Sequence, residues 1–203
     1  MRFTSIIVSG FCLASSLFAN GLKVKEGQLA PRFSLIRLDD GQKRVGLRDF
    51  ADSARHALKP DFGKPVILSF WSTTCVNCKA EFPRLQKWAT AHPDVQFFPV
   101  LVEDVDPAQG MAWLRAAGVS VDGLHDRYQV VGKSYGVCEG NTCTVPALVV
   151  IGPDQKVKLA KSGYHPEEPM EALLTAAVST TPVVPAPVQV AAPVPAPVPA
   201  KKP

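Results

Sequence analysis

Two long apolar runs and several shorter patterns predict regular secondary structure between about residue 33 and residue 178. Residues 65–71, Pro-Val-Ile-Leu-Ser-Phe-Trp, and residues 95–102 are apolar enough to form buried strands. A helix is expected from Lys79 onward, where Phe82, Leu85 and Trp88 recur at helical spacing. The remaining patterns predict strands over 33–38, 44–47, 147–151 and 156–160, and helices over 51–58, 107–117, 128–135 and 167–178.

The order of these elements predicts the fold class. Strand, helix, strand and helix in succession from residue 65 favour parallel neighbours, whereas the hairpin at 147–160 adds antiparallel strands. We therefore expect an α/β domain with a central mixed sheet, preceded by a β-hairpin that turns at Asp40-Gly41. Pro83 lies inside the predicted central helix and should bend it, because it removes a backbone hydrogen bond.

The two ends of the chain differ in composition from the predicted domain at 20–178. Residues 1–19 have a basic start, an apolar stretch and small residues ending at Ala19, which is typical of a secretory signal peptide. We expect an exported, periplasmic protein that does not span the membrane once this segment is removed. Residues 179–203 are rich in Pro, Val and Ala, and predict a disordered, extended tail. A spacer that contacts a wall or membrane component is the alternative for this tail.

Charge and cysteine content narrow the possible chemistry. The net charge of +4 falls by one to +3 when Arg2 leaves with the signal, which is too small to favour nucleic acid as a partner. Cys12 leaves with the same segment, so the mature chain keeps an even number of cysteines. An even number in an oxidising compartment points to thiol-disulfide chemistry before metal binding. These four residues are Cys75, Cys78, Cys138 and Cys143.

The first pair forms a Cys-x-x-Cys motif at the junction of a predicted strand and a predicted helix. Free N–H groups and the positive end of the helix dipole favour a thiolate there. A thiolate can attack a disulfide or bind a soft metal, and the spacing of Cys75 and Cys78 also suits half of a zinc site. The motif by itself does not decide between these uses.

The second pair, Cys138 and Cys143, flanks the turn-forming sequence Glu-Gly-Asn-Thr. Three uses are open: a structural disulfide that fixes a loop, a second redox pair that relays electrons to the first, or a site in which all four thiolates bind zinc or copper.

Several motifs together resemble the thioredoxin fold, and in particular its exported TlpA/ResA-like branch. The resemblance covers about residues 27–174 and implies a three-layer sandwich around the mixed sheet. It is carried by Leu-Ala-Pro-Arg-Phe-Ser-Leu at 29–35, Gly-Lys-Pro-Val-Ile-Leu-Ser-Phe-Trp at 63–71, and Cys-Lys-Ala-Glu-Phe-Pro at 78–83.

The resemblance assigns roles to matched positions. Cys75 would be the nucleophile and Cys78 the buried partner that resolves the mixed disulfide. Val145 and Pro146, with Thr144 before them, match a cis-proline loop that offers backbone groups to a substrate chain.

Glu81 matches a carboxylate near the cysteines of this branch, where it could accept the proton of Cys78, with a pKa raised by desolvation. The alternative is an exposed first-turn glutamate that pairs with Arg84. An acidic loop at 103–106 is interpreted as solvated, and His92, His125 and His165 are given no role.

Three features of the sequence depart from better-known relatives. Thr74 stands where many have tryptophan, which reduces the apolar docking surface, and Ser69 replaces a buried aspartate of cytosolic thioredoxins. Val76 and Asn77 replace the residues that usually tune thiolate stability between the cysteines, so a redox potential cannot be transferred.

These observations predict an exported thiol-disulfide oxidoreductase without a cofactor or metal. The resemblance favours a reductase of envelope proteins such as apocytochrome c, supplied by a membrane electron donor of the DsbD/CcdA type. Its partners would be protein substrates with disulfides or thiols. The alternatives are a copper-handling protein, a disulfide oxidase or isomerase, and a tail-mediated interaction protein. A peroxidase is disfavoured, because Ser72 stands where Thr-x-x-Cys would place threonine.

Overall fold

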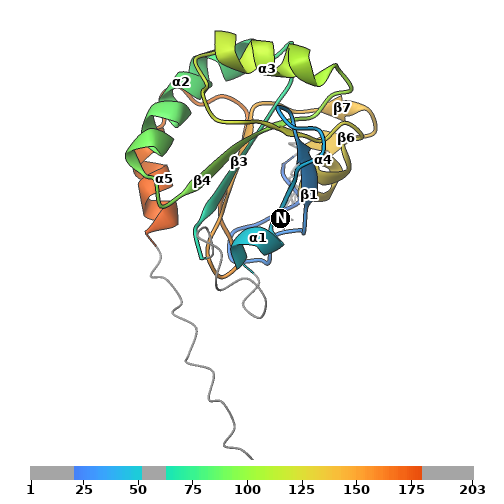
Figure 1. Cartoon of the computed structure of the whole chain (residues 1–203). Helices are drawn as coiled ribbons and strands as arrows, with labels where there is room; N and C mark the ends of the chain where they lie inside the picture. The colour runs from blue at the N-terminus through green and yellow to red at the C-terminus, as the bar shows by residue number, and fades with distance from the viewer. Residues whose placement is uncertain (1–20, 52–62, 180–203) are drawn as a thin grey trace, which may run out of the picture.

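A computed structural model describes residues 21–51 and 63–179 of the chain (Figure 1). The predicted signal peptide, most of the predicted helix at 51–58 and all but the first residue of the predicted tail lie outside these residues. Among the described residues, no helix is long and apolar enough to cross a membrane.

The centre of the molecule is a seven-stranded mixed sheet in the order β2-β1-β5-β4-β3-β8-β9. β3 pairs in parallel with β4, and β4 pairs in parallel with β5, whereas β8 runs antiparallel to β3. The strands are β1 (Ser34–Arg37), β2 (Arg44–Gly46), β3 (Val66–Trp71), β4 (Gln96–Leu101), β5 (Leu124–His125), β8 (Ala147–Ile151) and β9 (Val157–Ser162).

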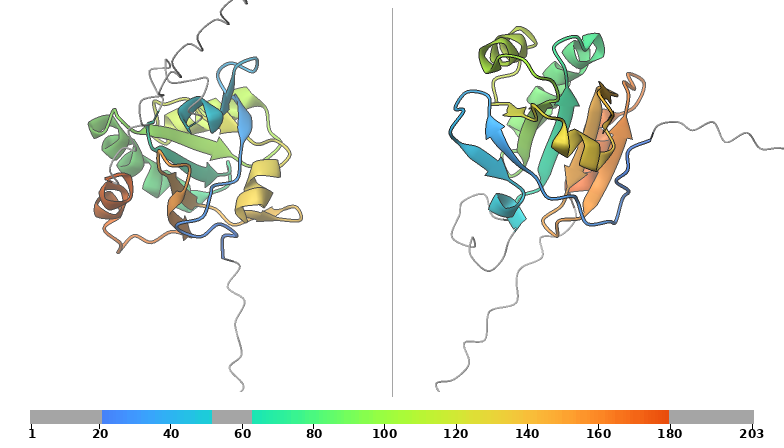
Figure 2. Two further views of the ribbon diagram at one scale, coloured as in Figure 1. Left: turned by 90° about the horizontal axis from the view of Figure 1, so that it is seen from below. Right: turned by 90° about the vertical axis from the view of Figure 1, so that its right-hand side faces the viewer.

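Helices cover both faces of this sheet, which confirms the expected three layers (Figures 1 and 2). α2 (Val76–Ala91), α3 (Pro107–Ala116) and α5 (Met170–Val178) contribute to the core on one face. α1 (Arg48–Ala51) and α4 (Val130–Tyr135) contribute to the core on the other.

The alternation along β3 explains why the sheet has two cores. Val66, Leu68 and Phe70 belong to the core with α4, whereas Ile67 and Trp71 belong to the core with α2, α3 and α5. Successive side chains of a strand point to opposite faces, so a continuous apolar run indicates burial on both. The expectation from the sequence pattern of this run is confirmed.

The expected N-terminal hairpin is present as β1 and β2, but it belongs to the central sheet. β1 pairs antiparallel with β5, a strand of two residues, Leu124 and His125, that the sequence pattern did not predict. Strands this short carry no readable alternation. The hairpin therefore extends the sheet edge.

Several helix starts differ from the prediction: α1 begins earlier, at Arg48 and not at 51, and α5 begins later, at Met170 and not at 167. The starts of α2 and α4 differ for local reasons. α2 begins at Val76 and not at Lys79, because the sulfur of Cys75 acts as its N-cap and accepts the N–H of Cys78. α4 begins at Val130 and not at 128, because Gln129 has a left-handed φ of 58°. α2 continues through Pro83 as one helix.

Candidate active site

The Cys-x-x-Cys pair lies at the start of α2, where β3 ends. Cys75 and Cys78 form a disulfide, with their Cα atoms 5.3 Å apart. Cys75 retains 8% of its accessible surface and Cys78 retains none. On either side of Cys75, Thr74 is exposed and Val76 is 80% exposed, so an incoming sulfur can approach this cysteine alone. The nucleophilic role of Cys75 and the resolving role of Cys78 stay predictions, with a geometry that suits them.

The backbone around Cys75 also favours its thiolate. The sulfur accepts the N–H of Cys78 at 3.2 Å, in the N-cap position of a 16-residue helix. Hydrogen bonding to the charged form and the helix dipole both stabilise a thiolate at this place. The reduced protein should therefore present Cys75, and not Cys78, as its reactive group.

Aromatic side chains pack against the active-site turn on its buried side. Trp71 is fully buried, stacks on Trp113 of α3 with ring centroids 4.5 Å apart, and meets Phe82 of α2 edge-on at 6.0 Å. Lys79 lies over the outer ring, 5.6 Å from the Trp113 centroid. The predicted core role of Trp71 beneath the cysteine turn is confirmed.

Glu81 is buried one helical turn after Cys78, with 5% of its surface accessible. Desolvation raises its pKa to about 7, although the nearby charges of Arg84 and His165 act in the opposite direction. One carboxylate oxygen, Oε2, is buried without a hydrogen-bond partner. A carboxyl group with this pKa can exchange a proton with its surroundings near neutral pH.

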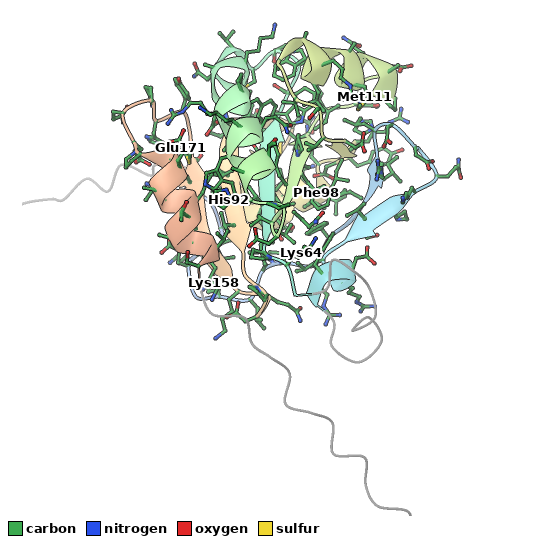
Figure 3. The ribbon with its side chains drawn as sticks, turned by 60° about the vertical axis from the view of Figure 1, so that its left-hand side comes forward. Lys64, His92, Phe98, Met111, Lys158 and Glu171 are labelled. Atoms are coloured by element: carbon green, nitrogen blue, oxygen red, sulfur yellow. A yellow bond between two sulfur atoms is a disulfide. The ribbon has the colours of Figure 1, made fainter. Side chains whose placement is uncertain are left out.

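The alternative prediction of an exposed Glu81 paired with Arg84 is wrong. Arg84 points to α5 instead and forms an ion pair with Glu171 at 3.1 Å; Glu171 stands at the start of α5, beside α2 (Figure 3). The predicted proton-acceptor role of Glu81 is not tested by this placement, but the burial that it requires is present. Ser69 is also buried, but its side chain has no carboxylate that could take the proton in place of Glu81.

The loop before β8 contains a cis peptide bond between Val145 and Pro146, as the resemblance implied. The N–H of Thr144 donates to Val137 at 2.8 Å, and the Pro146 carbonyl accepts from Gly163 at 2.8 Å. Val145 is half-buried and packs against both hydrophobic cores, one of which contains Cys75 and Cys78. Substrate binding by Thr144, Val145 and Pro146 stays a prediction.

Glu103 is a residue that the sequence interpretation missed. Its Oε1 accepts the backbone N–H of Thr73 at 2.5 Å, and its carbonyl oxygen lies 2.9 Å from Nε2 of His125. The loop is therefore only partly solvated, and His125 has a structural partner. The sequence contained one signal for this contact. An acidic residue directly follows a predicted strand, and that strand was expected to run parallel to the strand before the Cys-x-x-Cys.

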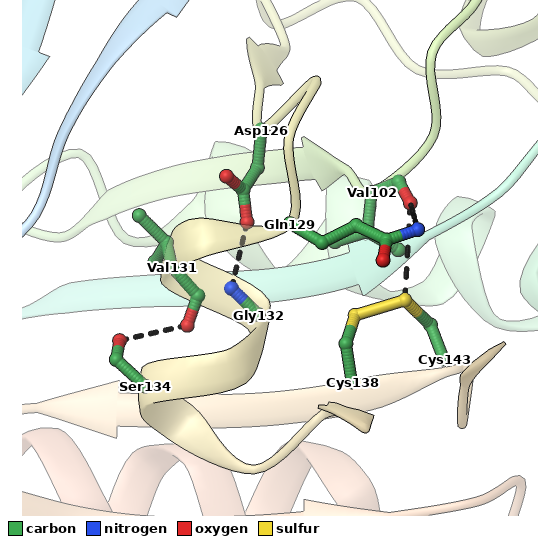
Figure 4. Close-up of a disulfide and its surroundings, with 8 residues drawn as sticks. All are labelled: Val102, Asp126, Gln129, Val131, Gly132, Ser134, Cys138 and Cys143. Atoms are coloured by element: carbon green, nitrogen blue, oxygen red, sulfur yellow. Dashed lines mark hydrogen bonds between the residues drawn. A yellow bond between two sulfur atoms is a disulfide. The ribbon is translucent and has the colours of Figure 1, made fainter. Parts of the chain in front are cut away.

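The second cysteine pair forms a disulfide across a two-stranded ribbon of β6 (Cys138–Glu139) and β7 (Thr142–Cys143). Cys138 retains 1% of its surface, whereas Cys143 is only half-buried, with Sγ 3.8 Å from the Val102 carbonyl oxygen (Figure 4). Among the described residues, no three His, Cys, Asp or Glu side chains are arranged to hold a metal ion.

A central mixed sheet with helices on both faces, a Cys-x-x-Cys disulfide at the start of α2 and a cis-proline loop define a thioredoxin-fold thiol-disulfide oxidoreductase. The model of the AhpC/TSA family matches residues 27–160, and the chain belongs to this family. The chain is 27% identical over 164 residues to the thiol-disulfide oxidoreductase ResA of Bacillus subtilis (strain 168), across 80% of this chain and 81% of that relative.

Solved structures agree with the fold. One similar structure is described as a thiol:disulfide interchange protein DsbE from Chlorobium tepidum, with a TM-score of 0.59 and 24% identity over 76% of this chain and 98% of that one. Another is a secreted disulfide oxidoreductase of Mycobacterium tuberculosis homologous to E. coli DsbE, with a TM-score of 0.51 and 22% identity, covering 71% of this chain and 92% of that one. These similarities confirm the thioredoxin fold of the chain.

Proposed function

We propose that the protein is an exported reductase that keeps thiols of envelope proteins reduced. The observation that carries this proposal is the burial of Glu81 beside the buried Cys78, with a carboxyl pKa of about 7. A base of this strength can take the proton of the resolving thiol at neutral pH. Deprotonation of Cys78 would favour release of the substrate, which is the step that completes its reduction.

The reaction would run in two exchanges. The thiolate of Cys75 attacks one sulfur of a substrate disulfide, and the bonding electron pair leaves with the other substrate sulfur. Cys78 then gives its proton to Glu81 and attacks Cys75, which releases the second substrate thiolate. The substrate gains two electrons and the enzyme keeps the disulfide between Cys75 and Cys78.

The substrate would be an extended segment of a protein. The backbone groups of Thr144 and Val145, before Pro146, are the expected partners of such a segment beside Cys75. A Cys-x-x-Cys-His sequence, the attachment site of c-type haem, is the substrate that we propose, because it must be reduced before haem is attached. A membrane electron donor of the DsbD/CcdA type would restore the dithiol after each turnover.

Export is proposed from the N-terminal sequence pattern. N-terminal sequencing of protein recovered from the cell envelope should begin at Asn20. A chain that retains residues 1–19 in the cytoplasm would contradict this part of the proposal.

The reductase direction is tested by the reduction potential of the first cysteine pair in the full mature chain. A value near that of thioredoxin, about −270 mV, supports the reductase, and a value near about −120 mV supports an oxidase. The same protein should reduce an oxidised Cys-x-x-Cys-His peptide, and a Cys75→Ser variant should not. The Cys78→Ser variant is the matched control, since it should accumulate the mixed disulfide with the peptide. A potential in the oxidase range, or peptide reduction by Cys75→Ser, would overturn the proposal.

A further inference from the structure

A two-residue segment, Val102 and Glu103, lies between the turn that carries the first disulfide and Cys143 of the second. Toward the first pair, the N–H of Val102 donates to the Trp71 carbonyl at 3.0 Å, and Glu103 accepts from Thr73. Toward the second pair, the carbonyl oxygen of Val102 faces Sγ of Cys143 at 3.8 Å (Figure 4). The turn that leads into the first pair, and Cys143 of the second pair, therefore contact the same short piece of backbone.

The carbonyl of Val102 offers an acceptor that the oxidised second pair cannot use. A disulfide sulfur carries no proton, so Cys143 can donate to this oxygen only after reduction to a thiol. The side chain of Gln129 already donates to the same oxygen at 3.2 Å and holds it in place. The site is thus built to accommodate the reduced as well as the oxidised form.

Access to the second disulfide is one-sided. The sulfur of Cys138 lies against Gly132 of α4, where even an added Cβ would come within 2.6 Å of it. Cys143 is half-buried and is the side of the bond that an external thiolate can reach. This asymmetry matches that of Cys75 and Cys78.

The ribbon that carries the second disulfide borders a pocket on one side. A cavity of about 380 Å³ borders it, lined by Cys138, Glu139, Thr142 and Thr144 among others. Thr144 leads directly into the cis-proline loop. A shift of the ribbon on reduction would therefore reach the loop beside the first cysteine pair.

We propose that Cys138 and Cys143 form a second redox-active disulfide, entered at Cys143, whose state changes the reactivity of the first pair through Val102 and Glu103. This goes beyond the proposed reductase function and does not depend on the direction of that reaction.

The reaction at the second pair is an ordinary dithiol-disulfide exchange. A thiolate of an external dithiol attacks Sγ of Cys143, and the bonding pair leaves with Cys138. The second thiol of the donor then loses its proton and attacks the donor sulfur bound to Cys143, which releases Cys143. The donor is oxidised by two electrons to a disulfide, and both cysteines take up protons from water.

The second redox site is tested on a chain that lacks the first. The Cys75→Ser/Cys78→Ser variant is incubated with dithiothreitol without denaturant, alkylated and analysed by peptide mass spectrometry. We expect Cys138 and Cys143 to be reduced while the fold is intact, at dithiothreitol ratios within about 100-fold of those that reduce the first pair in the unmodified chain. Glutathione should form its mixed disulfide on Cys143 and not on Cys138. Reduction only after denaturant is added would show a purely structural disulfide and overturn the proposal.

The coupling is tested by a double-mutant cycle. The exchange equilibrium of Cys75 and Cys78 with dithiothreitol is measured in the unmodified chain, in Cys138→Ser/Cys143→Ser, in Glu103→Gln and in the combined variant. We expect the loss of the second pair to shift the equilibrium at least five-fold, and to shift it much less when Glu103 is already replaced. Equal shifts in both backgrounds, or no shift, would overturn the coupling. Circular dichroism of each variant confirms that the comparison is made between folded chains.

Discussion

At the scale of single residues, burial of one carboxyl group provides the most specific chemistry of the site. Glu81 gains no compensating ion pair, since Arg84 is occupied by Glu171, and its Oε2 has no hydrogen-bond partner. Burial without a partner favours the neutral acid. Because burial destabilises the charged carboxylate, Glu81 titrates near neutral pH.

The first prediction concerns the reactivity of Cys78. In a Cys75→Ser chain, alkylation of Cys78 should accelerate as pH rises through about 7, because Glu81 becomes able to accept the thiol proton in that range. Adding Glu81→Gln should remove this step and slow alkylation roughly 100-fold near pH 7.5. The exposed Glu26 provides the control, since Glu26→Gln should leave the profile unchanged. An unaltered profile in Glu81→Gln would remove the proton-acceptor role.

The second prediction concerns stability. The pKa of Glu81 is about 7 when folded and near its ordinary 4.5 when unfolded, so the folded state retains a proton that the unfolded state has lost. The free energy of unfolding should therefore fall as pH rises from about 4.5 to about 7, by about 3 kcal/mol at most. Denaturant unfolding at several pH values should show this fall in the unmodified chain and not in Glu81→Gln. If the free energy of unfolding depended on pH in the same way in both proteins, the raised pKa of Glu81 would be contradicted.

At the scale of elements, close packing of α4 against the ribbon of β6 and β7 depends on a glycine. Gly132 lies in α4, and the nearest atom to an added Cβ would be Sγ of Cys138 at 2.6 Å, which is far below ordinary contact. The neighbouring Oδ2 of Asp126 accepts the N–H of Gly132 at 2.6 Å and limits movement of the helix. The helix therefore has little room to come closer to the ribbon.

The third prediction follows from this packing. Gly132→Ala should lower the free energy of unfolding by about 1–3 kcal/mol, because the added methyl group overpacks a buried contact. Gly41→Ala is the control, since an added Cβ there meets nothing within 4 Å and should change stability little. Equal stability of Gly132→Ala and the unmodified chain would show that the contact relaxes without cost.

The elements that the sequence pattern predicted well are those whose burial is simple. The strand expected at 65–71 appears as Val66–Trp71 because both faces are covered by helices. The start of α2 depends on the sulfur of Cys75 as its N-cap, and β5 depends on pairing with β1 and β4. Neither interaction leaves a periodic signal in the sequence. The hydrogen bond between Glu103 and Thr73 also leaves no periodic signal, because it joins segments that follow two parallel strands; only the position of an acidic residue after a strand pointed to it.

At the scale of the whole molecule, the sheet brings together segments that are distant in sequence. The Cys-x-x-Cys turn follows β3, Glu103 follows β4, and the cis-proline loop precedes β8, which are three neighbouring strands. Because β8 runs antiparallel to β3, its beginning lies at the same edge as the ends of β3 and β4. The site residues could be chosen from the sequence, but only the strand order places them together.

The fourth prediction concerns the C-terminal segment, for which the sequence pattern predicts a disordered tail. α5 ends at Val178, and Ser179 closes it by donating its N–H and its hydroxyl to the Thr175 carbonyl at 3.1 Å and 2.6 Å. A chain that stops after Ser179 keeps both bonds and the packing of Leu174 in the core, so its unfolding midpoint and peptide reduction rate should equal those of the full chain. A chain that stops after Leu174 is the matched control, and should unfold more readily because it lacks the last turn of α5. Reduced activity of the first truncation in vitro would show that residues 180–203 contribute to the domain. Unchanged activity with altered localisation in cells would instead support the spacer role.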